Sequence, residues 1–136
     1  MFMNLSVHDN LLLSYSVNAR LKEIRLHTST YPYDDPQEYV DVLFSGVVAY
    51  HFECDNFNNI LFGVEEVSLE AIYDQYSEMF ERLRKHGWPL LSCDTKEIML
   101  QNLHQQEIKA YEISASLGLT GWVWARSCTR SRTNAT

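Results

Sequence analysis

Residues 67–89, VSLEAIYDQYSEMFERLRKHGWP, predict one amphipathic helix whose two ends are both marked in the sequence. Its apolar residues recur at the i, i+3, i+4, i+7 spacing of a single buried face: Leu69, Ile72, Tyr73, Tyr76, Met79, Phe80 and Leu83. Ser68 can cap the first turn, because its hydroxyl can accept a hydrogen bond from a free backbone N–H. Gly87 and Pro89 end the helix, since glycine adopts the left-handed C-cap conformation and proline cannot continue a helix. A helix with one apolar face needs a core to cover, so the stretch predicts a layer packed on a sheet.

The residues before this helix alternate between apolar and polar side chains, as strands do. Leu11–Asn18 and Glu23–Thr28 are separated by a short polar turn, and they predict an antiparallel hairpin. Tyr39–Cys54 predicts a strand that is too long to stay straight, with a bend or bulge expected at Gly46. Ile60–Glu66 predicts a further strand that leads into the helix.

The residues after Pro89 predict four shorter elements. These are an edge strand over Leu90–Cys93, a helix over Thr95–Gln105, and a second hairpin made by Ile108–Ser116 and Trp122–Arg126. Hairpin-connected strands around one long helix predict an α+β fold, a curved antiparallel sheet packed against one main amphipathic helix. We expect a single domain over residues 1–126. Residues 127–136 contain almost no apolar side chain and are expected to form a polar, flexible tail.

The charge of the chain is distributed unevenly. The net charge is −7, and the segment from Leu26 to Glu81 carries acidic side chains but no Lys or Arg. A long acidic segment opposes binding to a phosphate backbone, so no nucleic-acid partner is expected. The same segment would attract a basic protein and speed its encounter. Solubility alone also explains such a surface, and this alternative stays open.

Targeting and cysteine signals predict a cytoplasmic protein. No apolar run approaches the roughly 20 residues that span a bilayer, so no membrane partner is expected. The first ten residues lack the basic flank and apolar core of a signal peptide. Cys54, Cys93 and Cys128 show no spacing typical of a disulfide framework or a zinc site, which favours reduced thiols.

Acidic and aromatic side chains supply the predicted partner-binding set. It consists of Asp34, Asp35, Glu38, Asp41, Glu53, Trp122 and Trp124. The first three lie in or beside a proline-containing loop, and the next two lie on the polar side of the long strand. Trp122 and Trp124 share one face of a strand and would form an exposed aromatic patch if the helix leaves that face uncovered.

Two other functions stay open. His51, Glu53 and His27 could gather a divalent ion on the polar sheet face and support a small metal-dependent or acid–base enzyme. The sequence has no HExxH, G-x-S-x-G, Walker or dinucleotide motif, so no catalytic residue, metal ligand or cofactor is assigned. A homo-oligomer with Trp122 and Trp124 buried between copies is the remaining alternative.

Both ends of the chain resemble known sequences. VHDNLLLSYSVN (7–18), followed by ARLKEIRLHTS (19–29), is similar to the start of several small uncharacterised bacterial families, in which a His-Asp pair introduces the first strand of a hairpin. YEISASLGLTGWVWA (111–125) is similar to their closing strand–glycine–strand element. Some of these families are regarded as immunity proteins that neutralise the toxins of neighbouring bacteria. The resemblance implies a small α+β fold and a non-catalytic protein-binding role, here the masking of a basic toxin by an acidic face. It carries over no catalytic residue.

Overall fold

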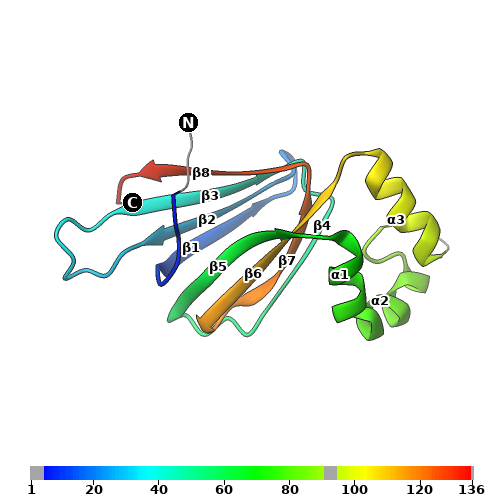
Figure 1. Ribbon diagram of the computed structural model, residues 1–136, viewed down its shortest axis with the longest axis horizontal. Helices are drawn as coiled ribbons and strands as arrows, with labels where there is room; N and C mark the ends of the chain where they lie inside the picture. Colours follow the sequence, from blue (N-terminus) through cyan, green and yellow to red (C-terminus); the bar gives the residue numbers. More distant parts are fainter. Residues whose placement is uncertain (1–4, 91–94, 136) are drawn as a thin grey trace.

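The computed structural model describes residues 5–90 and 95–135, and strands dominate it (Figure 1). Within these residues, eight strands form one antiparallel sheet: β1 (Leu11–Asn18), β2 (Glu23–Ser29), β3 (Tyr39–Ser45), β4 (Ala49–Glu53), β5 (Asn59–Val67), β6 (Lys109–Leu117), β7 (Thr120–Ala125) and β8 (Ser127–Thr133). The helical elements are α1 (Leu69–Gln75), α2 (Ser77–Leu83), the 3-10 helix η1 (Arg84–His86) and α3 (Lys96–Gln105). The antiparallel sheet agrees with the sequence prediction, but several short helices stand in place of one main helix.

The strands follow the order β4-β7-β6-β5-β1-β2-β3-β8 in the sheet. Each of the two edge strands, β4 and β8, comes directly after an inner strand in the sequence. β4 follows β3, and β8 follows β7 after Arg126. Ser45 at the end of β3 faces Ser127 of β8. At the corner where β3 ends and β8 begins, the Arg126 N–H donates a hydrogen bond to the Ser45 carbonyl at 3.0 Å. Beyond this corner, Ala49 at the start of β4 pairs with β7. The sheet therefore folds over on itself into two layers, β1–β2–β3–β8 and β5–β6–β7–β4 (Figure 1).

Apolar side chains from both layers fill the space between them. Members of this inner core include Leu12, Ile24, Leu26, Val42, Phe44, Leu61, Val64, Tyr111, Ile113, Leu119 and Val123. Phe44 of β3 and Tyr111 of β6 contact each other across it, with ring centroids 5.6 Å apart. Gly46 occupies the corner with φ +66°, and a Cβ there would lie 2.9 Å from the Arg126 side chain. The bend expected at Gly46 is confirmed, because only glycine combines this φ with so close a neighbour.

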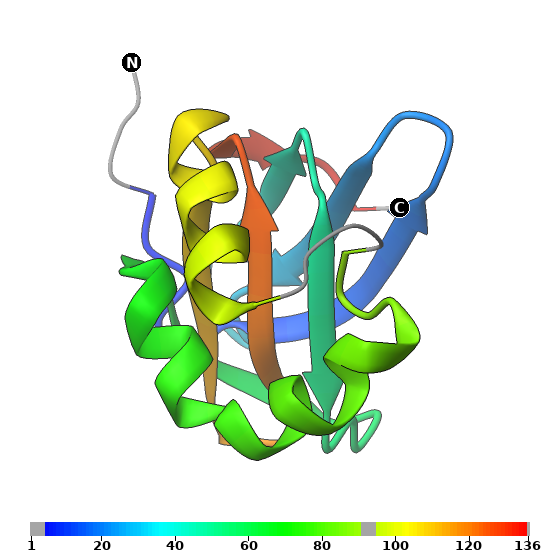
Figure 2. The ribbon, with the colours of Figure 1, turned by 90° about the vertical axis from the view of Figure 1, so that its right-hand side faces the viewer.

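A second core lies on the outer face of the layer that contains β4, β7 and β6. Successive strand residues point to opposite faces, so Val123 enters the inner core while Trp122 and Trp124 point outward. The helices pack on these two tryptophans, and Figure 2 shows α1, α2 and α3 in front of the strands. Phe80 of α2 lies at the centre, stacked on Trp124 with ring centroids 5.2 Å apart.

The prediction of one continuous helix is wrong, although its caps are correct. Ser68 Oγ accepts a hydrogen bond from the Ala71 N–H at 3.0 Å, but α1 ends at Gln75 and α2 begins at Ser77. The break has a packing consequence. In a straight helix the seven-residue separation of Tyr73 and Phe80 would place them about 10 Å apart along the axis. Here their rings stack with centroids 4.7 Å apart, so the break lets both enter one aromatic core.

The prediction of a flexible tail over residues 127–136 is also wrong for most of its length. Residues 127–133 form β8, which pairs with the whole of β3. Arg130 then ties this strand to two distant segments. Its Nη1 donates to the Leu5 carbonyl at 2.7 Å, and its Nη2 donates to the Val64 carbonyl at 2.5 Å. Backbone pairing and one guanidinium therefore hold a segment that carries almost no apolar side chain.

The second predicted helix and hairpin are confirmed as α3 and β6–β7. Thr95 caps α3 by accepting a hydrogen bond from the Ile98 N–H at 3.1 Å. The strand predicted over Leu90–Cys93 falls mainly on residues 91–94, outside the described residues. Among the described helices, none is long and apolar enough to span a bilayer.

Candidate functional site

The acidic loop between β2 and β3 presents two of the predicted carboxylates to solvent. Asp34 and Asp35 are exposed, and Asp34 Oδ2 accepts a hydrogen bond from the Tyr31 N–H at 2.9 Å. Glu38 is exposed as well, but it pairs with Arg132 of β8 at 3.1 Å. Asp34 and Asp35 are therefore exposed without an ion pair among the described residues, whereas Glu38 has the cation of Arg132 beside it.

Asp41 is not part of the exposed surface. It is only 7% exposed, and its Oδ1 lies 2.6 Å from His27 Nδ1. Arg25 and Thr133 donate to the same carboxylate at 2.9 and 3.1 Å. Burial alone would raise the pKa of Asp41, but the hydrogen bonds from His27, Arg25 and Thr133 outweigh it and hold that pKa below its ordinary value. The prediction of Asp41 as a contact residue is wrong, because it is a buried charge that joins β2, β3 and β8.

Glu53 of β4 lies beside a row of residues that face one another across β4, β7, β6 and β5, on the side of the sheet that the helices cover. Cross-strand pairing places His51 of β4 opposite Trp122, Trp122 opposite Glu112 of β6, and Glu112 opposite Glu65 of β5. Two carboxylates thus face each other directly on neighbouring strands, an arrangement that costs stability unless a cation lies nearby. Among the described residues, neither Glu65 nor Glu112 takes part in an ion pair.

The break between α1 and α2 places Tyr76 over this row. Its ring centroid lies 5.9 Å from that of His51, and His51 Nε2 lies 2.8 Å from Glu53 Oε1. Burial raises the pKa of Tyr76, and the charges of Glu53 and Glu112 raise it further. Tyr76 therefore stays a neutral hydroxyl beside an acidic surface, which we call the acidic row (His51, Glu53, Glu65, Tyr76 and Glu112).

Trp122 and Trp124 are not available to a partner. Both are 0% exposed, and Phe80 contacts each of them with ring centroids about 5 Å away. The expectation that they share one face is confirmed, but the helices cover that face. Their use as an exposed patch, or as an interface between two copies, is therefore contradicted.

The three residues of the metal-site hypothesis do not meet. His27 contacts Asp41 of β3, whereas His51 contacts Glu53 of β4. Within the described part of the chain, no group of three His, Cys, Asp or Glu side chains could hold a metal ion. The structure thus divides the proposed ligands between two separate pairs.

A surface that the sequence analysis missed lies at the turn between β4 and β5. Phe57 is 94% exposed and has φ +62°, a rare conformation for a bulky residue. Asp55 Oδ1 accepts hydrogen bonds from the Phe57 N–H and from Asn59 Nδ2, both at 2.9 Å. Asn59 is buried, and its Oδ1 accepts a hydrogen bond from the Leu119 N–H at 2.9 Å. These hydrogen bonds hold the backbone of the turn in place, whereas the Phe57 ring is exposed to solvent.

Other apolar residues line a hollow together with Phe57. The Phe57 patch consists of Leu11, Leu13, Phe57, Ile60 and Leu117, which line a hollow of about 210 Å³ together with Leu12, Asn58 and Asn59. Leu11, Ile60 and Leu117 lie side by side across β1, β5 and β6. The available sequence signal was a phenylalanine inside DNFNN, where turn chemistry favours polar residues.

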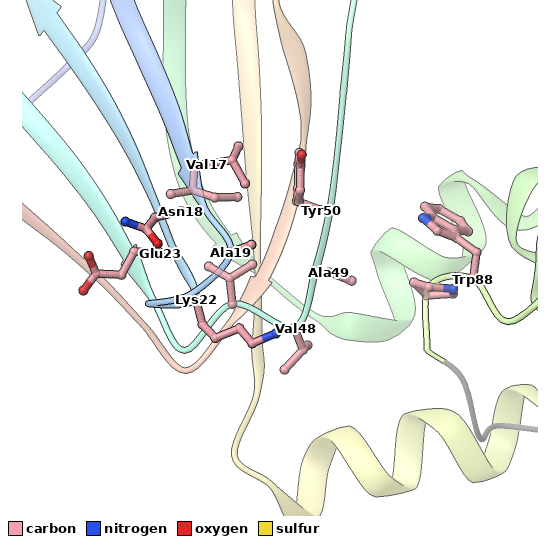
Figure 3. A pocket seen from close by; sticks show the side chains of 12 residues that line it. Val17, Asn18, Ala19, Lys22, Glu23, Val48, Ala49, Tyr50 and Trp88 are labelled. Atoms are coloured by element: carbon pink, nitrogen blue, oxygen red, sulfur yellow. The ribbon is translucent and has the colours of Figure 1, made fainter.

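A second hollow, the corner hollow, lies where the β1–β2 turn meets the corner between β3 and β4 (Figure 3). It encloses about 260 Å³. Its walls include Val17, Ala19, Val48, Ala49, Tyr50 and Trp88, and Lys22 lies at its edge. Lys22, Glu23 and Asn18 are the polar residues of its lining, and apolar walls with a few polar groups are typical of small-ligand sites.

Comparison of the chain with protein-family models, with curated proteins and with solved structures finds no match.

Proposed function

We propose that this chain is a non-catalytic protein-binding domain of the bacterial immunity type, which masks a basic partner such as a toxin. The Phe57 patch carries the proposal. Exposed aromatic side chains on a fixed backbone are typical centres of binding energy in protein interfaces, because little conformational freedom is lost when they are buried. A patch of five apolar residues that includes such a ring is the kind of surface that a partner covers.

The charge beside the patch favours a basic partner. Hydrogen bonds from the Asn59 side chain, the Phe57 N–H and the Tyr15 hydroxyl lower the pKa of Asp55, so this carboxylate stays ionised next to the exposed ring. The patch also lies within a chain of net charge −7. Two copies of the chain would repel each other, whereas a basic protein would be attracted.

The acidic row and the Asp34–Asp35 loop give further anchoring points. Glu65 and Glu112 face each other, and no described residue forms an ion pair with either, so a Lys or Arg from a partner would relieve their repulsion. Asp34 and Asp35 are exposed at the tip of their loop. Their contribution is expected to act mainly on the association rate and its salt dependence.

The experiment measures binding of the purified chain to the basic proteins encoded next to its own gene, at low and at high salt. The Phe57→Ala variant should weaken binding by about 2 kcal/mol, as expected for an interface hot spot. Leu21→Ala is the matched control, because Leu21 is also an exposed apolar side chain, at 60% exposure, but lies on the basic β1–β2 turn. It should bind like the wild type.

The double variant Glu65→Gln/Glu112→Gln should lower the association rate and flatten its salt dependence, whereas Glu97→Gln on α3 should not. If the acidic side chains serve solubility alone, every variant should bind the basic proteins as the wild type does. A dimer that forms with rising concentration and is lost in Phe57→Ala would instead assign the patch to a second copy of the chain.

A further inference from the structure

We infer that the corner hollow binds a ligand that combines an apolar body with a single carboxylate, the apolar part within the hollow and the carboxylate on Lys22. The walls provide the first part of the argument. Val17 and Ala19 come from the β1–β2 hairpin, Val48 and Ala49 from the corner and β4, and Trp88 from the segment after η1. An apolar group that binds among these side chains is removed from water on several sides, and this burial of apolar surface favours binding.

Lys22 supplies the charge. Among the described residues its ammonium group has no hydrogen bond or ion pair. Figure 3 shows its side chain extending toward Val48, whereas the carboxylate of Glu23 points away from Tyr50 and Trp88. The one cation at the edge of the hollow is therefore unneutralised, and a carboxylate is the group that it would pair with most strongly.

The position of Lys22 is fixed by its backbone. Its φ is +58°, and its carbonyl accepts a hydrogen bond from the Val47 N–H at 2.9 Å. The Asn18 side chain holds the same turn by accepting a hydrogen bond from the Leu21 N–H at 3.0 Å. The turn is thus pinned to the corner that forms the opposite wall, so little order has to be gained when a ligand binds.

The volume limits the size of the ligand. At about 260 Å³, the hollow lies below the roughly 300–1,000 Å³ of sites for drug-sized molecules. A short alkyl or single-ring carboxylate fits this description. The C-terminal residue of a peptide offers the same chemistry, an apolar side chain beside a carboxylate, and the experiment below separates the two sources.

The experiment follows backbone and indole N–H signals of the protein by NMR while octanoate is added. Octan-1-ol and octylamine are titrated in the same way as the uncharged and cationic control matches. Octanoate should shift the signals of Lys22, Ala49 and Trp88 and should bind more tightly than either match. A peptide with C-terminal leucine and its amidated form are tested alongside. Tighter binding of the free-acid peptide than of octanoate identifies a chain end as the ligand, and the reverse order identifies a small molecule.

Two variants locate the contact. Lys22→Asn keeps a residue that tolerates positive φ and removes the ammonium, so it should weaken octanoate binding about tenfold, as expected for the loss of a charge-assisted hydrogen bond, while octanol is unaffected. Ala19→Trp fills the hollow from an exposed turn and should abolish both. Lys109→Asn, at an exposed lysine of β6 that does not line the hollow, is the matched control. Equal affinity of the wild type for octanoate and octanol, or an unchanged octanoate affinity in Lys22→Asn with a native spectrum, would overturn the inference.

Discussion

Replacing Arg130 with methionine should destabilise the fold strongly, although the residue lies in a segment whose composition resembles a tail. The two hydrogen bonds from its guanidinium, at 2.7 and 2.5 Å, link β8 to the carbonyls of Leu5 and Val64. A hydrogen bond that involves a charged group contributes about 1.5–3 kcal/mol. Because Arg130 is only half-buried, we take the lower value for both bonds and expect a loss of about 3 kcal/mol. That is a large share of the roughly 5–15 kcal/mol by which a domain is stable.

Urea unfolding followed by tryptophan fluorescence measures this loss, because Trp122 and Trp124 are fully buried in the folded state. Methionine keeps most of the aliphatic stem, so the comparison isolates the guanidinium. Arg132→Met is the matched control in the same strand. The Arg132–Glu38 pair is 3.1 Å long, with side chains 61% and 46% exposed, and such surface pairs contribute about 0–1 kcal/mol. Equal, small losses in the two variants would refute the reasoning and show that β8 contributes little to stability.

Two further predictions concern titratable groups. The folded-state pKa of Asp41 lies below its ordinary value of 3.8, so its stabilisation is present above that pH and is lost as the pH falls through the folded value. Unfolding free energies measured between about pH 5 and pH 3 should therefore decline less in Asp41→Asn than in the wild type; parallel declines would contradict this. Burial raises the pKa of the Cys128 thiol to about 11, and Arg130 offsets this only in part. In a Cys93→Ser background, a thiol reagent at mildly alkaline pH should modify the exposed Cys54 quickly and Cys128 slowly, and equal rates would contradict the packing of β8 on β3.

Local chemistry predicted most strand and helix positions. Alternation identified the β1–β2 hairpin, Gly46 identified the corner, and Ser68 identified the start of α1. Each of these signals depends on a few adjacent residues, so sequence alone can supply it. The break at Tyr76 is different, because 3.6-residue periodicity is the same for one long helix and for two short ones. Only the position of Trp122 and Trp124 below Phe80 shows why the helix divides.

The same limit explains β8. An edge strand with one exposed face needs a backbone partner more than it needs apolar side chains, and its partner β3 lies far away in the sequence. Arg130 adds contacts to Leu5 and Val64 that no local pattern encodes. Polar composition therefore predicted a tail where long-range pairing makes a strand.

In the candidate site, burial decides which of the aromatic side chains are accessible at the surface. Trp122 and Trp124 carry the stronger sequence signal for an aromatic patch, since two indoles share one strand face. The helices cover them, whereas Phe57, which lies in a polar turn, is exposed. Periodicity reports which residues share a face, but a face becomes a surface only if nothing else in the chain covers it. In this protein the cover comes from α1, α2 and α3, whose placement depends on the break at Tyr76, and that same break places the Tyr76 ring over the acidic row. The packing that hides the predicted patch therefore also shapes the acidic row.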